Sequence, residues 1–314
     1  MKKKCYFFVD DVIWVFRDIA RQKPKSIFEH HFLASLKKAH DLYGLKVQLN
    51  AFYRTDFYYG VDEFTLKDMP DIYKQEWEEA SDWLKISVHS LQEFPDYPFV
   101  NADYNDVKTV FELIKIEVIR FAGEKSFGYA VNPHWLPVSK EGCEAFRDCG
   151  VVLLGTSAGK RVDYDGNPAS LPYGHAQRLL NNRKPETALF IRPSRDEAIA
   201  SSICGYNHFT NEISDATLNN LKYYTDEKLG IKFKRFCTGP VVNLTPISEI
   251  EEELSGYLDN EFIGYGTHEQ YFYPEYFAYQ KDSEQKLLKA AGYLKANGYE
   301  HIFIEEIIKE EDEK

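Results

Sequence analysis

The stretch Tyr6-Phe7-Phe8-Val9-Asp10-Asp11-Val12 carries the strongest indication of the fold of this chain. Its apolar residues are typical of a buried strand, and the run ends in two adjacent carboxylates before a helix-like segment. Desolvation disfavours charged carboxylates, so the pair needs a cation, hydrogen bonds or a raised pKa. A divalent metal would meet that need, with one aspartate as ligand and the other as base. The alternative is that Asp10 and Asp11 only cap the helix that follows.

Composition excludes several classes of protein. The chain has 314 residues, of which 44% are hydrophobic and 28% charged, so it can bury a large core and is typical of globular proteins. The formal net charge is -12, and the one run of three basic residues is Lys2-Lys3-Lys4. This charge balance argues against nucleic acid or an anionic membrane as a partner.

Cysteine usage and the N-terminus bear on the compartment. The five cysteines form no CxxC pair, so neither a zinc knuckle nor a disulfide framework is indicated. The apolar run after Lys4 is broken at Asp10 with no small-residue cleavage site beyond it, and no stretch reaches the roughly 20 apolar residues of a membrane span. We therefore expect a cytoplasmic protein. The sequence leaves the oligomeric state open.

Strand and helix patterns alternate about seven times along the chain. Apolar or alternating runs predict strands at 6–9, 45–53, 83–88, 127–131, 151–154, 231–236, 262–267 and 301–308. Helical spacing, capping boxes and terminal glycines predict helices at 26–43, 105–122, 139–149, 248–254 and 282–297. This alternation predicts an α/β fold with a mainly parallel sheet, and the length favours a barrel over an open sheet. Residues from about 156 to 210 break the rhythm and predict an inserted loop or β region.

Polar side chains follow several of these strands. Asp10, Asp11, His89, His134 and His268 each come directly after an apolar run. Parallel α/β folds place their chemistry at the carboxyl ends of the strands, so we expect these five residues to converge on one rim.

The order of these motifs resembles the polysaccharide deacetylase (NodB-like) family. The resemblance rests on Asp10-Asp11 after the first strand, His89-Ser90 followed by Pro95 after the third, and Thr267-His268 near the end. It implies one irregular (β/α)7 TIM-like barrel domain over residues 1–314, with the insertion at about 156–210 inside it. It also implies a hydrolase of C–N bonds that uses a divalent metal, most often zinc.

The resemblance also assigns roles to residues. It places the catalytic base on Asp10, the general acid on His268, and metal ligands on Asp11 and His89. The second histidine of the family's His-Ser/Thr-x-x-His-Pro motif is replaced by Glu93, whose carboxylate is an ordinary metal ligand. The family's Arg-x-Pro-Tyr motif has no good match, and Asn132-Pro133-His134-Trp135 stands in its place, so His134 could complete the ligand set instead.

These roles imply removal of an acetyl group from an N-acetylated sugar or a related small saccharide. The metal would polarise the amide carbonyl and lower the pKa of a bound water, Asp10 would take the proton, and His268 would protonate the leaving amine. His134, Trp135 and Tyr97 are the predicted substrate-binding residues, with the two aromatic rings as faces for sugar stacking.

Two other functions remain open. The first is a non-catalytic barrel that binds a carbohydrate or small ligand after losing a ligand histidine. The second is a glycoside hydrolase, which is disfavoured because adjacent Asp10 and Asp11 would not readily straddle a glycosidic bond. Several of these residues could instead have no functional role. Glu93 would then be a solvated loop acid and His268 a structural histidine, and His30, His31 and His40 are expected on the surface of a helix or between helices.

Overall fold

The computed structural model describes residues 3–55, 63–95, 97–136, 138–156, 223–276 and 278–308, and its chain forms two compact units. Unit 1 comprises residues 1–92, 113–128 and 237–314, and unit 2 comprises residues 93–112 and 129–236. All but the first residue of the insertion predicted at about 156–210 lie outside the described residues. That residues 1–314 form a single barrel domain stays a prediction.

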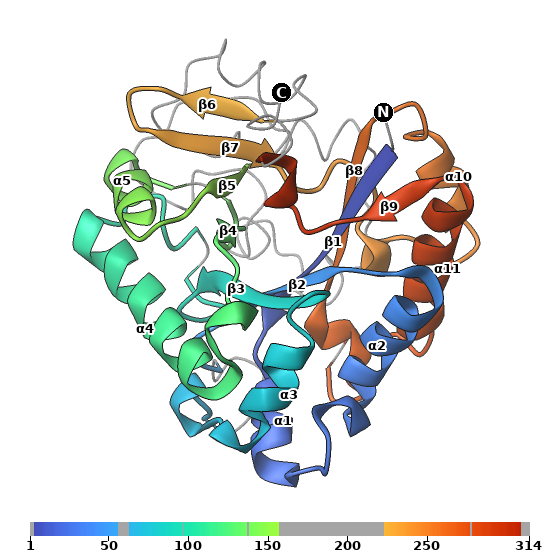
Figure 1. The fold of residues 1–314 in the computed structure, drawn as a ribbon, viewed down its shortest axis with the longest axis horizontal. Coiled ribbons are helices and arrows are strands. Elements are labelled where there is room, and N and C mark those ends of the chain that lie inside the picture. Colours follow the sequence, from blue (N-terminus) through green and yellow to red (C-terminus); the bar gives the residue numbers. More distant parts are fainter. Residues whose placement is uncertain are drawn as a thin grey trace, which may run out of the picture. The chain divides into compact units, whose positions relative to one another are not determined.

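Unit 1 is built on a parallel sheet in the order β3-β2-β1-β8, with β9 also paired to β1 (Figure 1). The apolar runs predicted as strands form its core, because side chains such as Val9, Leu49 and Ile86 are fully buried. The strands are β1 Lys3–Val12, β2 Val47–Phe52, β3 Leu84–Ser90, β8 Phe262–His268 and β9 Tyr299–His301. The closing strand is thus shorter than the predicted 301–308 and starts earlier.

The α-helices of unit 1 are α1 Trp14–Gln22, α2 His31–Tyr43, α3 Lys74–Glu79, α10 Ile250–Ser255 and α11 Ser283–Ala296. Helix α11 packs against α2, as Figure 1 shows. The helix predicted from residue 26 begins only at His31, because Ser26 caps a separate 3-10 turn at Ile27–Glu29 by accepting a hydrogen bond from the amide of Phe28. The other 3-10 turns are Leu66–Asp68, Asp71–Tyr73, Glu124–Ser126, Val242–Leu244 and Glu269–Phe272.

Unit 2 contains a second sheet in the order β4-β5-β7-β6, in which the β6–β7 pair is antiparallel. Its elements are β4 Ala130–Val131, α5 Lys140–Asp148, β5 Leu153–Thr156, β6 Tyr224–Asp226 and β7 Ile231–Arg235. Helix α4, Tyr104–Ala122, begins in unit 2 and ends in unit 1. Ser139 caps α5 by accepting a hydrogen bond from the amide of Gly142, at the residue where the sequence predicted the start of this helix.

The α/β class and the mainly parallel pairing are confirmed. The pairings recorded among the described strands form two sheets and include no closed ring, so closure into a barrel stays a prediction. Within the described part of the chain, no helix combines the length and the apolar character needed to cross a membrane.

A buried carboxylate closes the N-terminus of α1. Helix α1 has no acidic residue in its first turn, and its N-cap residue, Ile13, makes no side-chain capping bond. Glu269, fully buried at the end of β8, instead accepts hydrogen bonds from the amides of Ile13, Trp14 and Val15 at 2.7, 2.8 and 2.6 Å. These are three of the four amides that a helix start leaves unsatisfied, and the positive end of the helix dipole favours the carboxylate there.

Burial makes the stability of the fold depend on the charge of Glu269. Desolvation raises the pKa of Glu269 from 4.5 to about 7, although the hydrogen bonds to its carboxylate act in the opposite direction. A raised pKa means that the folded state holds the proton more tightly than the unfolded state. The associated stability is present below pH 4.5 and is lost as pH rises through about 7.

We expect Glu269→Gln to abolish this component. The unfolding free energy of the wild type should fall by up to about 3 kcal/mol relative to the variant between pH 4.5 and 7.5. Urea titrations of both proteins across this pH range measure the difference. Parallel pH profiles for the two proteins would show that Glu269 does not titrate in this window.

Candidate metal and acid-base site

The carboxyl end of β1 departs from regular strand geometry at the paired aspartates. Successive side chains of a regular strand point to opposite faces, which would separate Asp10 from Asp11. The register of β1 on β2 shifts between Val9 and Val12, and Asp11 has a φ of 61°, in the left-handed region. A bulge of this kind turns one side chain out of the alternating order.

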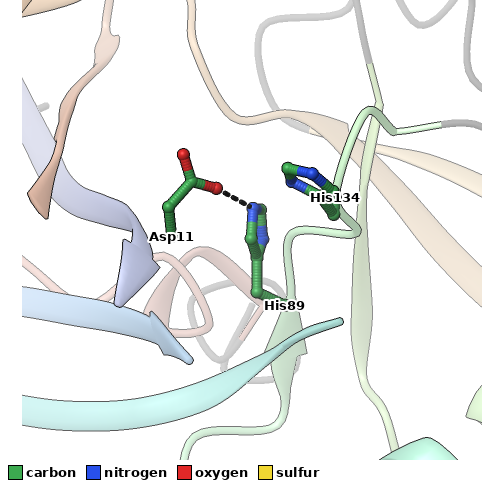
Figure 2. A group of neighbouring side chains, drawn as sticks. All are labelled: Asp11, His89 and His134. Atoms are coloured by element: carbon green, nitrogen blue, oxygen red, sulfur yellow. Dashed lines mark hydrogen bonds and ion pairs between the residues drawn. The ribbon is translucent and has the colours of Figure 1, made fainter. Parts of the chain in front are cut away.

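Both aspartates consequently face one imidazole. The Nε2 atom of His89, at the end of β3, lies 3.1 Å from Oδ1 of Asp11, as Figure 2 shows, and its Nδ1 atom lies 3.9 Å from Oδ1 of Asp10. All three residues are buried. Two carboxylates around one imidazole leave excess negative charge when His89 is neutral, and a divalent cation would offset it. The carboxylate oxygen and imidazole nitrogen offered here are common metal donors.

A chain of side-chain amides orients Asp10. Gln48 and Asn50 lie two residues apart on β2, so their side chains point to the same face. Nε2 of Gln48 donates to Oδ1 of Asn50 at 2.7 Å, which fixes the orientation of the Asn50 amide, and Nδ2 of Asn50 donates to Oδ1 of Asp10 at 2.6 Å. Sequence reasoning missed this pair, although two polar residues inside the strand Val47–Phe52 are a usable signal.

His268 ends β8 directly opposite Asp10 in the sheet. Its Nδ1 atom and its backbone amide each lie 3.1 Å from Oδ1 of Asn243, and the Thr267 hydroxyl donates to the same oxygen. An amide oxygen only accepts, so the hydrogen bond requires the proton on Nδ1 of His268 and leaves Nε2 for other partners. Asn243, 4% exposed, is a second residue that the sequence analysis missed, because no local pattern marks the 3-10 turn that carries it.

Unit 2 contains the remaining predicted site residues. The imidazole of His134 is buried, and its Nε2 atom lies 2.9 Å from the backbone carbonyl oxygen of Glu93. The carboxylate of Glu93 is also buried, which is inconsistent with a solvated loop acid. The ring of Trp135 lies 5.3 Å from that of Tyr97 and is partly exposed, whereas Tyr97 is buried.

The backbone that carries the aromatic pair is strained. Tyr97, Trp135 and Leu136 have φ values of 54°, 59° and 74°, in the left-handed region that glycine normally occupies. Such strain gathers at functional sites, where the surrounding structure fixes the backbone. Of Tyr97 and Trp135, only Trp135 is partly exposed and can present its ring to a ligand. Tyr97 and Val100 are buried and pack against Trp135.

Comparison with known proteins places the chain among structures of this fold. No family model and no curated protein matches the sequence. The 4-α-glucanotransferase of Thermococcus litoralis matches 98% of this chain at a TM-score of 0.52 and 10% identity, and the match covers 40% of that protein. The chain therefore spans less than half the length of this relative, and the similarity shows the fold alone.

Solved deacetylases are also among the matches, with TM-scores below 0.5. A putative polysaccharide deacetylase from Mycobacterium smegmatis has a TM-score of 0.48 and 10% identity over 99% of this chain and 91% of its own. A family 4 acetyl xylan esterase from Clostridium thermocellum, solved with a cobalt ion, has a TM-score of 0.44 and 10% identity over 99% and 92%.

The His268–Asn243 contact can be tested without a substrate. We expect the neutral ring of His268 to carry its proton on Nδ1 in the wild type and to lose this preference in Asn243→Leu, which removes the acceptor oxygen at similar volume. Asn243→Asp keeps an acceptor oxygen and should retain the preference. Long-range ¹⁵N–¹H NMR spectra of the imidazole distinguish the two tautomers, and equal spectra for wild type and Asn243→Leu would contradict the assignment.

Proposed function

We propose that the protein is a metal-dependent hydrolase of C–N bonds that removes the acetyl group from an N-acetylated sugar or a related small saccharide. The observation that carries the proposal is the bulge at the end of β1, which turns Asp10 and Asp11 toward the same imidazole of His89. This arrangement suits the two roles that the motif resemblance implies, with Asp10 as the catalytic base and Asp11 as a metal ligand.

Asp11 and His89 would hold the metal, with His134 as the third ligand. The Nε2 atom of His134 lies 2.9 Å from the backbone carbonyl oxygen of Glu93, and Nδ1 would be the nitrogen that binds the cation. Ligand histidines commonly donate their other ring N–H to a backbone carbonyl in this way. Glu93 would then act through its backbone rather than as a ligand. When bound, a divalent cation polarises the amide carbonyl and lowers the pKa of a coordinated water.

The acid-base steps follow from the hydrogen bonds of the chain's own residues. Oδ1 of Asp10 accepts a hydrogen bond from Asn50, which orients the carboxylate, and Asp10 would take a proton from the attacking water. His268, with its Nδ1 hydrogen directed at Asn243, would protonate the departing amine from Nε2. The partly exposed Trp135 would stack on a sugar ring, with Tyr97 supporting it from behind.

Metal content tests the ligand assignment. We expect one equivalent of zinc, cobalt or manganese per chain after reconstitution, and at least about 10-fold weaker binding in His89→Ala and His134→Ala. His31→Gln is the matched control, because His31 is exposed and its Nε2 atom lies 3.2 Å from the backbone carbonyl oxygen of Phe272. Elemental analysis and competition with a chelating dye provide the measurement.

Acetate release tests the reaction. N-acetylglucosamine and its β-1,4 dimer and tetramer are suitable first substrates, and Asp10→Asn should keep the metal while turnover falls by about 10²- to 10⁴-fold. A wild type that takes up none of these metals would reject the hydrolase. Sugar binding to such a protein would then identify a carbohydrate-binding protein.

A further inference from the structure

The strained backbone at Asp11 requires an external restraint. Asp11 has a φ of 61°, in the left-handed region, which aspartate adopts more readily than most non-glycine residues but still at a cost in strain. Contacts that fix the backbone on both sides of Asp11 offset this cost. On the N-terminal side, β1 pairs with β8 through Asp10. On the C-terminal side, Val12 pairs with Ala51 of β2 and ends β1. The chain then leaves the sheet, and α1 begins at Trp14.

Glu269 adds a second restraint on that side, at the residues that follow Val12. Its Oε2 atom accepts hydrogen bonds from the amides of Ile13 and Trp14, and its Oε1 atom accepts from the amide of Val15 and the hydroxyl of Tyr273. The four donors satisfy both carboxylate oxygens. Because Glu269 follows β8, it ties the start of α1 to the strand that carries His268.

We propose that Glu269 is a positioning residue that holds the left-handed turn at Asp11 and thereby keeps the Asp11 carboxylate against His89. Its consequence for metal affinity rests on the proposed function, whereas its consequence for the Asp11–His89 hydrogen bond does not. Glu269 itself is fully buried, so a substrate would not reach its carboxylate. In this proposal, Glu269 affects the site only through the position of Asp11.

The chemistry of the contact gives a sharp variant. Glu269→Gln has nearly the same shape but replaces one acceptor oxygen by an NH₂ group. Every partner of the carboxylate is a donor, so in either orientation of the amide the NH₂ group would face an N–H or O–H donor. Glu269→Asp keeps both acceptor oxygens but has a side chain shorter by one methylene, which moves the oxygens away from the amides. This variant replaces Glu269→Gln in the experiment if the glutamine variant does not fold.

The direct test uses NMR of the protein stripped of metal with a chelator. In the wild type, we expect a downfield His89 Nε2–H resonance, bonded to Asp11, and downfield amide resonances of Ile13, Trp14 and Val15. Both sets should shift upfield in Glu269→Gln, and by a smaller amount in Glu269→Asp. An unchanged His89 resonance in a variant whose three amides have shifted would overturn the proposal.

Two control variants separate positioning from general loss of stability. Tyr273→Phe removes one bond to the same carboxylate and leaves the three amide bonds, so it should keep the His89 resonance. Leu294→Ala opens a cavity in α11 and should lower the melting temperature while the resonance stays in place. If either control moved the His89 resonance as far as Glu269→Gln does, the effect would be nonspecific and the proposal would fail.

Cobalt titration then links the restraint to the metal. Glu269→Gln should weaken Co²⁺ binding by about 10-fold or more, with wild-type affinity in Tyr273→Phe and Leu294→Ala. A wild type without Co²⁺ affinity would refute the proposed function, and the His89 resonance would still decide whether Glu269 positions Asp11. Wild-type affinity in Glu269→Gln with a shifted His89 resonance would contradict the link between positioning and metal affinity.

Discussion

The candidate site depends on one irregularity, the bulge at the end of β1. A regular strand would direct Asp10 and Asp11 to opposite faces, and only one of them could then reach His89. The register shift and the left-handed φ of Asp11 bring both carboxylates to the two nitrogens of a single ring. The geometry costs backbone strain, and we propose that the hydrogen bonds that Glu269 accepts from the amides of Ile13, Trp14 and Val15 offset that cost.

The buried polar groups around the bulge are linked by specific partners. Asp10 is held by Asn50, whose orientation Gln48 fixes, and His268 is held by Asn243. A neutral amide fixes the direction of a side chain through one defined donor or acceptor without adding a charge to a buried site. The amides of Asn50 and Asn243 therefore orient Asp10 and His268 without adding a charge beside them. In our proposal, the aspartates and histidines then bind the cation and transfer the protons.

Unit 2 contains both Glu93 and His134, which the sequence left as alternative third ligands. The imidazole of His134 lies against the backbone carbonyl of Glu93, and this contact supports our proposal that His134 is the ligand. Trp135 and Tyr97 likewise divide their predicted role, because only Trp135 is partly exposed and the buried Tyr97 ring packs behind it.

The sequence by itself determined the α/β class, the strands that carry Asp10, His89 and His268 near their carboxyl ends, and the mainly parallel pairing. These follow from local apolar runs and caps, which are encoded within a few residues. Only the tertiary structure decided the bulge at Asp11 and the roles of Asn50, Asn243 and Glu269. Their contacts with Asp10, His268 and Ile13 join residues 40, 25 and 256 positions apart. No local pattern fixes such contacts, because they arise when the strands align side by side. The sequence places the polar residues at the ends of the strands, and packing of the sheet determines which of their atoms meet.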